Sequence, residues 1–102
     1  MIIINNLGYL KYKNLKFRCS LGKAGVGVKK REGDNITPKG TFKIIKIYYR
    51  KDKIKKIRTI FKLIKIEKNM GWCNDPKSKR YNREIKIPFK FSYEKLYRRD
   101  SL

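Results

Sequence analysis

Residues 29–40 (KKREGDNITPKG) contain the first group of side chains suited to binding chemistry. The segment is polar, rich in turn formers and long for a loop, which is typical of a functional segment. Its carboxylates can accept backbone N–H groups at a tight corner, or they can hold a basic or amide group of a ligand. The candidates in this segment are Glu32, Asp34, Thr37, Pro38 and Gly40.

The second group lies in the turn-rich stretch from residue 69 to 82. It combines aromatic faces with hydrogen-bonding groups, a mixture that suits an amphipathic ligand. The candidates are Trp72, Asp75, Tyr81 and Asn82. Trp72 could equally fill the edge of a core, and the sequence leaves both interpretations open.

The chain contains few residues that could act as a nucleophile or as a metal ligand. The chain has two cysteines, Cys19 and Cys73, and no histidine, so no Cys–His or Ser–His–Asp machinery can be assembled from it alone. Cys19 shares the phase of apolar residues in an alternating run, which indicates a small hydrophobic side chain. We therefore predict no catalytic residue, no metal site and no cofactor.

The formal net charge of +21 is the most unusual feature of the composition. It favours a polyanionic partner, either nucleic acid or another anionic polymer. The alternative is compositional drift, because lysines are scattered among apolar residues along the chain rather than gathered in one block. A G-x-x-G-x-G run at residues 22–27 matches no established phosphate-loop pattern.

Apolar alternation predicts a mainly β fold with one or two short helices. Phe17 and its neighbours at positions 15–21 give the clearest pattern, a strand with one buried face. A phase slip at Ile44–Ile45 suggests a bulge, and Ser92 is placed to cap a helix over 93–99. The expected strands are 2–4, 9–12, 15–21, 41–49, part of 57–67, and 84–88.

The chain shows no apolar run long enough to span a bilayer and no signal-peptide pattern. We expect one domain over residues 1–102.

Four segments in order resemble the YkuD type of L,D-transpeptidase domain. They are C-S-L-G-K-A-G-V at 19–26, K-R-E-G-D-N-I-T-P-K-G-T-F-K-I at 30–44, G-W-C-N-D-P with Y-N-R and a later proline at 71–88, and S-Y-E-K-L-Y-R-R-D-S-L at 92–102. T-P-x-G-x-F alone is mostly turn chemistry, whereas four motifs at plausible spacing are specific. The resemblance runs over nearly the whole chain.

The resemblance implies a β-sheet or sandwich domain whose cysteine thiolate attacks a peptidoglycan stem peptide at the bacterial cell envelope. The family's histidine and Gly-Cys motif lie near its C-terminus, and residues 1–102 contain neither, so we expect a truncated, inactive domain. Cys73 lies in Gly-Trp-Cys and is not the nucleophile on this mapping. The chain could be a truncated product, half of a split domain or a relic.

An incomplete sheet would leave an uncovered apolar face and an open strand edge, which predicts self-association. The expected face contains Leu15, Phe17, Phe42 and Ile44. The expected partner is a stem peptide. The competing function is a basic nucleic-acid- or polyanion-binding module, although no recognition helix or zinc motif supports it.

Overall fold

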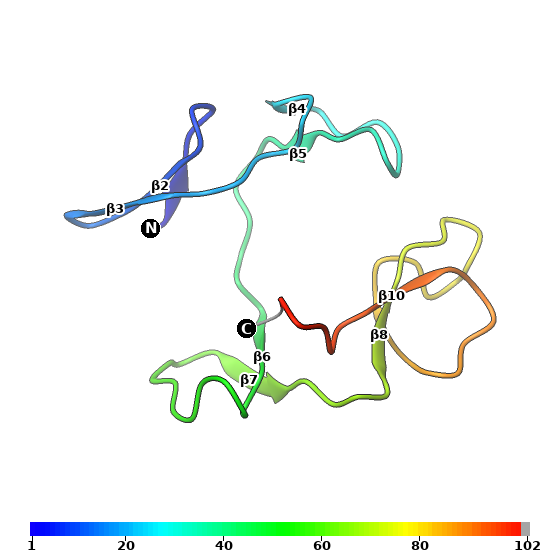
Figure 1. Ribbon diagram of the computed structural model, residues 1–102. Helices are drawn as coiled ribbons and strands as arrows, with labels where there is room; N and C mark the ends of the chain where they lie inside the picture. The colour runs from blue at the N-terminus through cyan, green and yellow to red at the C-terminus, as the bar shows by residue number, and fades with distance from the viewer. Residues whose placement is uncertain (101–102) are drawn as a thin grey trace. The chain divides into compact units, whose positions relative to one another are not determined.

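The computed structural model describes residues 1–100, and this part of the chain is mainly β, as the sequence predicted (Figure 1). It divides into two compact units, Met1–Thr41 (unit 1) and Phe42–Leu102 (unit 2). Each unit has a small three-stranded antiparallel sheet and a short parallel pair of strands.

Unit 1 starts with two successive β-hairpins. Asn5 makes the first turn, since its Oδ1 accepts the amides of Leu7 and Tyr9 at 3.1 and 3.0 Å, and Gly8 supplies a φ of 78°. Lys13, with a φ of 51°, lies in the second turn. The sheet order is β1-β2-β3, followed by the parallel pair β4-β5. These strands are β1 (Ile3–Ile4), β2 (Tyr9–Tyr12), β3 (Leu15–Arg18), β4 (Val26–Gly27) and β5 (Thr37–Pro38).

The expected buried face of the third strand is wrong. β3 ends at Arg18, and all four of its residues are exposed, with Leu15 at 55% and Phe17 at 54%. The alternation marks a strand correctly, but β3 lies at the edge of its sheet and Gly8 is the only buried residue of unit 1. The sheet of unit 1 therefore has no core of its own.

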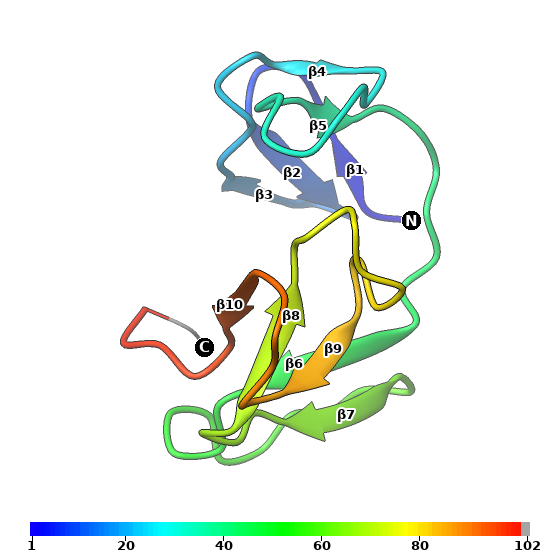
Figure 2. The same cartoon turned by 90° about the vertical axis from the view of Figure 1, so that its right-hand side faces the viewer.

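Unit 2 holds the hydrophobic core of the described residues. β8 is the central strand of the sheet β10-β8-β9, and β6 pairs in parallel with β7 (Figure 2). Ile66, Met70, Cys73 and Ile85 are the buried apolar side chains, and two of them belong to β8. The strands are β6 (Lys46–Tyr49), β7 (Lys62–Lys65), β8 (Met70–Cys73), β9 (Glu84–Lys86) and β10 (Tyr93–Lys95).

Two local predictions in unit 2 need correction. The helix expected over 93–99 is instead strand β10, because Tyr93–Lys95 pairs with Gly71–Cys73, and the hydroxyl of Ser92 donates to Asn74 Oδ1 at 2.7 Å. The strand expected from Thr41 begins only at Lys46, so the slip at Ile44–Ile45 is not a bulge within a strand. The turn-rich stretch from 69 to 82 also contains strand β8, which the sequence analysis did not predict.

Phe42 and Ile44, expected on an uncovered apolar face with Leu15 and Phe17, are exposed by 70% and 47%. The strand favoured within 57–67 is confirmed as β7. Among residues 1–100, no helix has the length and apolar character needed to cross a membrane.

Candidate functional site

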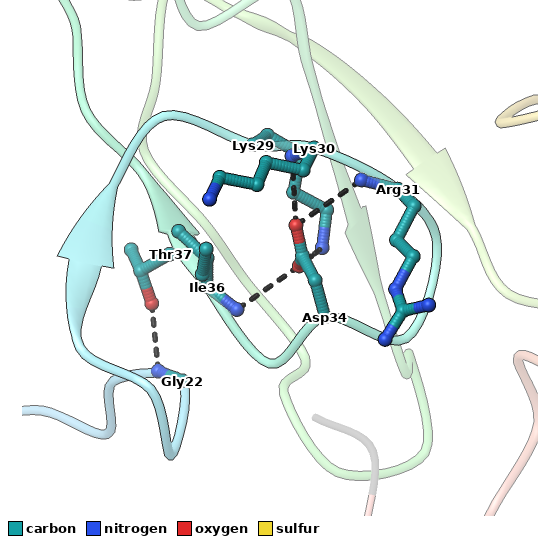
Figure 3. A network of polar contacts seen from close by, with 7 residues as sticks. All are labelled: Gly22, Lys29, Lys30, Arg31, Asp34, Ile36 and Thr37. Atoms are coloured by element: carbon teal, nitrogen blue, oxygen red, sulfur yellow. Dashed lines mark hydrogen bonds and ion pairs between the residues drawn. The ribbon is translucent and has the colours of Figure 1, made fainter.

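The loop between β4 and β5 is built around the carboxylate of Asp34 (Figure 3). Its Oδ2 accepts the backbone amides of Lys30 at 2.8 Å and Arg31 at 3.2 Å. Its Oδ1 accepts the amide of Ile36 at 3.1 Å and forms an ion pair with Lys29. One side chain thus satisfies three backbone donors that the curve of the loop would otherwise leave unpaired.

These contacts all favour the charged carboxylate. The ion pair with Lys29 and the hydrogen bonds from Lys30, Ile36 and Arg31 hold the pKa of Asp34 well below its ordinary value of 3.8. Only 7% of the side chain is exposed. Of the two roles that the sequence left open for this carboxylate, its contacts match the capping of a corner.

A second anchor fixes the other side of the same loop. The Gly22 amide donates to Thr37 Oγ1 at 2.7 Å, and the Thr37 amide donates to Gly25 O at 2.9 Å. A Cβ atom at Gly22 would lie 2.1 Å from the carbonyl oxygen of Asn35, so only glycine permits this approach. Gly22 is not among the site residues predicted from the sequence, although it lies in the glycine-rich run at residues 22–27.

The remaining predicted residues of unit 1 lie on the surface of this loop. Thr37 and Pro38 are extended in β5, and Gly40 has a positive φ of 151°, both as the T-P-x-G pattern predicts. Glu32 and Pro38 are exposed. The segment therefore presents a rigid corner whose shape is set by Asp34, Thr37 and Gly22.

In unit 2, Trp72 and Asn82 are brought into direct contact. The indole Nε1–H donates to Asn82 Oδ1 at 3.0 Å. Asn82 has a left-handed φ of 57°, which asparagine tolerates well, and its amide donates to Cys73 O at 2.9 Å. The turn after β8 thus returns to the strand and places the amide side chain against the indole ring.

Two further residues, missed by sequence analysis, complete this group. The rings of Tyr48 and Trp72 meet edge to face, with centroids 5.9 Å apart and an interplanar angle of 87°. The Tyr48 hydroxyl donates to Glu84 Oε1 at 2.8 Å. Burial raises the pKa of Tyr48, so the phenol remains a hydrogen-bond donor at neutral pH. We call Tyr48, Trp72, Asn82 and Glu84 the tryptophan cluster.

Only the tertiary structure of unit 2 could reveal this cluster, because its strand residues come from two separate sheets. Tyr48 lies on β6 and Glu84 on β9, opposite Trp72 in the ladder of β8 and β9. Nothing in the local sequence around Tyr48 or Glu84 indicates that they meet.

The other two candidates of unit 2 lie in the turn that follows β8. Asp75 Oδ1 accepts the amide of Lys77 at 3.0 Å, and its carbonyl accepts the amide of Ser78 at 3.1 Å, so this carboxylate shapes the turn. Tyr81 is 37% exposed, and its amide donates to Ser78 O at 3.0 Å.

Cys73 is completely buried in the centre of the same sheet. Its Sγ lies 3.9 Å from the carbonyl oxygen of Asp75. Cys19, in unit 1, is half-buried and has a free thiol. Among residues 1–100, no three His, Cys, Asp or Glu side chains gather in a group that could hold a metal ion.

The family model described as the L,D-transpeptidase catalytic domain, YkuD, matches residues 3–98. The chain belongs to the YkuD family. This match covers both units and all nine predicted site residues, from Glu32 to Asn82. Comparison with curated proteins and with solved structures gave no match.

Both groups of candidate residues lie within the span that the YkuD family model matches. The corner around Asp34 belongs to unit 1 and the tryptophan cluster to unit 2. Each group is held by contacts within one unit, since every hydrogen bond described for it joins residues of that unit.

Proposed function

We propose that this YkuD-family chain contributes a stem-peptide-binding surface of L,D-transpeptidase type and does not carry out acyl transfer by itself. The observation that carries the proposal is the family match over residues 3–98. The tryptophan cluster and the corner at residues 29–40 supply candidate binding surfaces within that span.

The cluster has the chemistry for a peptide that carries both polar and apolar groups. Trp72 and Tyr48 offer aromatic edges, and Asn82 and Glu84 offer an amide and a carboxylate within the same group. A stem peptide contains amides, ammonium groups and methyl groups, which match these three kinds of surface. On this proposal Glu32 and Tyr81 touch ligand, whereas Asp34 and Asp75 position backbone.

The acyl-transfer step of the family needs an accessible thiolate and a base. No residue of the 102 is a histidine, and the Cys73 side chain is 0% exposed. A substrate carbonyl must come within about 3–3.5 Å of the attacking atom, which the covering of Cys73 prevents. The proposal therefore assigns Cys73 to the core rather than to catalysis.

Incubation of the purified chain with a tetrapeptide-bearing muropeptide, followed by mass spectrometry, tests the catalytic part. We expect no cysteine-dependent turnover. Turnover that disappears in Cys73→Ala would contradict the assignment of Cys73 to the core, whereas turnover that persists in Cys73→Ala and disappears in Cys19→Ala would identify the other thiol.

Trp72, the only tryptophan, provides a direct probe of the binding part. We expect the muropeptide to change its fluorescence in a saturable way and Tyr81→Ala to weaken that binding. Tyr9→Ala, in unit 1, is the matched control for loss of a tyrosine. No fluorescence change and no binding by calorimetry would overturn the proposed function.

A further inference from the structure

A hollow of about 660 Å³ lies in unit 2 beside the end of β7. Its lining includes Lys51, Lys65 and Lys68, together with Asn69 and Tyr97. The hollow shares no lining residue with the tryptophan cluster or with the corner at residues 29–40, so it is a separate feature of the molecule.

The acidic residues of the hollow are already engaged. Asp52 receives two hydrogen bonds from Arg50, Nε to Oδ1 at 2.8 Å and Nη2 to Oδ2 at 2.7 Å. Glu67 lies 3.5 Å from Lys65 Nζ. Among residues 1–100, no carboxylate forms an ion pair with Lys51 or Lys68. The hollow therefore presents an excess of positive charge.

A stacked pair fixes the wall of the hollow. The guanidinium carbon of the buried Arg50 lies 3.6 Å from the centroid of the Tyr97 ring, and its Nη1 donates to Arg98 O at 2.7 Å. Lys68 Nζ lies 5.9 Å from the centroid of the same ring. Arg50 thus holds Asp52 and Tyr97 in place, so the lysines border a wall that is fixed by hydrogen bonds and stacking.

The surrounding chain adds to this charge. Residues 43–68 contain 11 lysines and arginines against two acidic residues, whereas residues 1–41 contain nine against two. The density of positive charge along the chain is thus higher in residues 43–68, which include most of the lining of the hollow, than in residues 1–41. Clustered cations on a concave surface raise the local concentration of polyanions.

We propose that this hollow binds a phosphate-bearing linear polymer, with Lys51 and Lys68 contacting successive phosphates and Lys65 exchanging its exposed ion pair with Glu67 for a third phosphate contact. Lysine ammonium groups are compact point charges that bind phosphate without a fixed geometry, and Asn69 adds amide donors. Single-stranded nucleic acid and phosphate-linked wall polymers both carry successive phosphates, so the positive charge of the hollow favours phosphate without distinguishing between these two polymers.

The test is fluorescence anisotropy on the full chain with labelled oligothymidylate, competed by unlabelled oligothymidylate, inorganic polyphosphate, polyglycerol phosphate or polyglutamate. The triple variant Lys51→Gln, Lys65→Gln, Lys68→Gln should weaken binding at least about tenfold at about 0.15 M salt. Its salt slope should fall by about 2, since each lost phosphate contact on a single strand contributes about 0.7. The triple Lys→Arg variant keeps the charge and should bind as the wild type does.

The matched control is Lys11→Gln, Lys23→Gln, Lys39→Gln, three exposed lysines of unit 1 that remove the same charge. It should weaken binding less than about threefold. Equal losses in the two triple variants would overturn the proposal, because binding would then follow net charge alone. Polyglutamate competing as well as polyphosphate would overturn the assignment to phosphate. Polyglycerol phosphate competing more strongly than oligothymidylate would identify a wall polymer as the source, and the reverse order would identify nucleic acid.

Discussion

Asp34 shows how much local structure one side chain can hold. Its carboxylate accepts three backbone amides and pairs with Lys29, so the curve from Lys30 to Ile36 depends on a single charge. The chain has eight acidic residues against 29 basic ones, so another carboxylate could replace that of Asp34 only if the loop rearranged. Two predictions follow from its contacts.

Asp34→Asn should open the loop locally. The amide side chain cannot pair with Lys29 and offers one acceptor oxygen in place of two. Hydrogen exchange at the amides of Lys30, Arg31 and Ile36 should accelerate at least severalfold. Glu94→Gln, which removes the same charge at an exposed position outside this loop, should leave these rates nearly unchanged, and equal acceleration in both variants would contradict the role given to Asp34.

The lowered pKa of Asp34 predicts the pH range in which the loop loosens. Its folded pKa lies below the ordinary value of 3.8, so an opened loop takes up the proton first as the pH falls. Protection should be constant well above pH 4 and should decline as the pH falls below about 4 toward the lowered pKa. The difference in protection between wild type and Asp34→Asn, measured from pH 6 downward, should shrink over that range. A difference that stays constant throughout would show that the carboxylate is not held in its charged form.

At the scale of elements, β8 organises unit 2. It pairs with both β9 and β10 and contributes Met70 and Cys73 to the core. Gly71 lies between these two residues, where the neighbouring strands approach closely. A Cβ atom there would meet Ile85 Cδ1 at 2.9 Å and Glu94 O at 3.1 Å.

Gly71→Ala should therefore destabilise the sheet of unit 2. Ile85 can move slightly, but the backbone oxygen of Glu94 cannot, so we expect a loss of about 1–3 kcal/mol in the free energy of unfolding. The matched control is Gly27→Ala on β4, where the added methyl would lie 3.8 Å from Ile36 Cγ2 in ordinary contact. Urea unfolding followed by Trp72 fluorescence measures both variants, and equal stability would contradict the close packing of β8.

Arg50 ties the segment after β6 to the end of the chain. Its guanidinium binds Asp52 through two atoms, donates to Arg98 O and stacks on Tyr97. Lysine at this position keeps the charge but lacks the planar fork that makes these contacts together.

The midpoint of urea unfolding should therefore fall from wild type to Arg50→Lys and further in Arg50→Met. Arg58→Met, at an exposed position, should leave the midpoint within error. Equal midpoints for wild type and Arg50→Lys would show that charge alone, and not the bidentate geometry, holds this connection.

At the scale of the whole molecule, charge and exposed apolar surface oppose each other. Exposed residues include Leu15, Phe17, Phe42 and Ile60, the last at 97%, and the edge strands β1 and β3 present unpaired backbone groups. The net charge of +21 repels copies of the chain at low salt, and salt shortens the range of that repulsion to about 8 Å at physiological strength.

We therefore predict self-association that increases with salt. Light scattering from low salt to about 1 M should show a rising apparent mass, and Phe17→Thr, which keeps a strand-forming residue at the edge, should reduce the rise. A monodisperse monomer at every salt concentration would mean that these apolar residues do not act as a contact surface.

The sequence by itself determined the family, the mainly β class, the first two hairpin strands and the shape of the T-P-x-G corner. These features depend on local rules, namely alternation of apolar residues, turn formers such as Asn5 and Gly8, and restricted backbone at Pro38. The sequence also singled out Asp34 as a carboxylate in a lysine-rich loop, but it left open whether this side chain caps the corner or binds a ligand.

Only the tertiary structure decided which apolar residues are buried and which polar residues meet. The pattern at Leu15 and Phe17 is the same in a covered and an uncovered strand, so alternation could not reveal their exposure. Residues 93–95 became strand β10 because β8 offered an edge, which outweighed the local capping pattern at Ser92. Tyr48 and Glu84, 36 residues apart in the chain, lie on different sheets of unit 2 and meet only through a side-chain hydrogen bond. Which strands pair depends on the free energy of the whole sheet, so the residues of one strand alone do not reveal its partner.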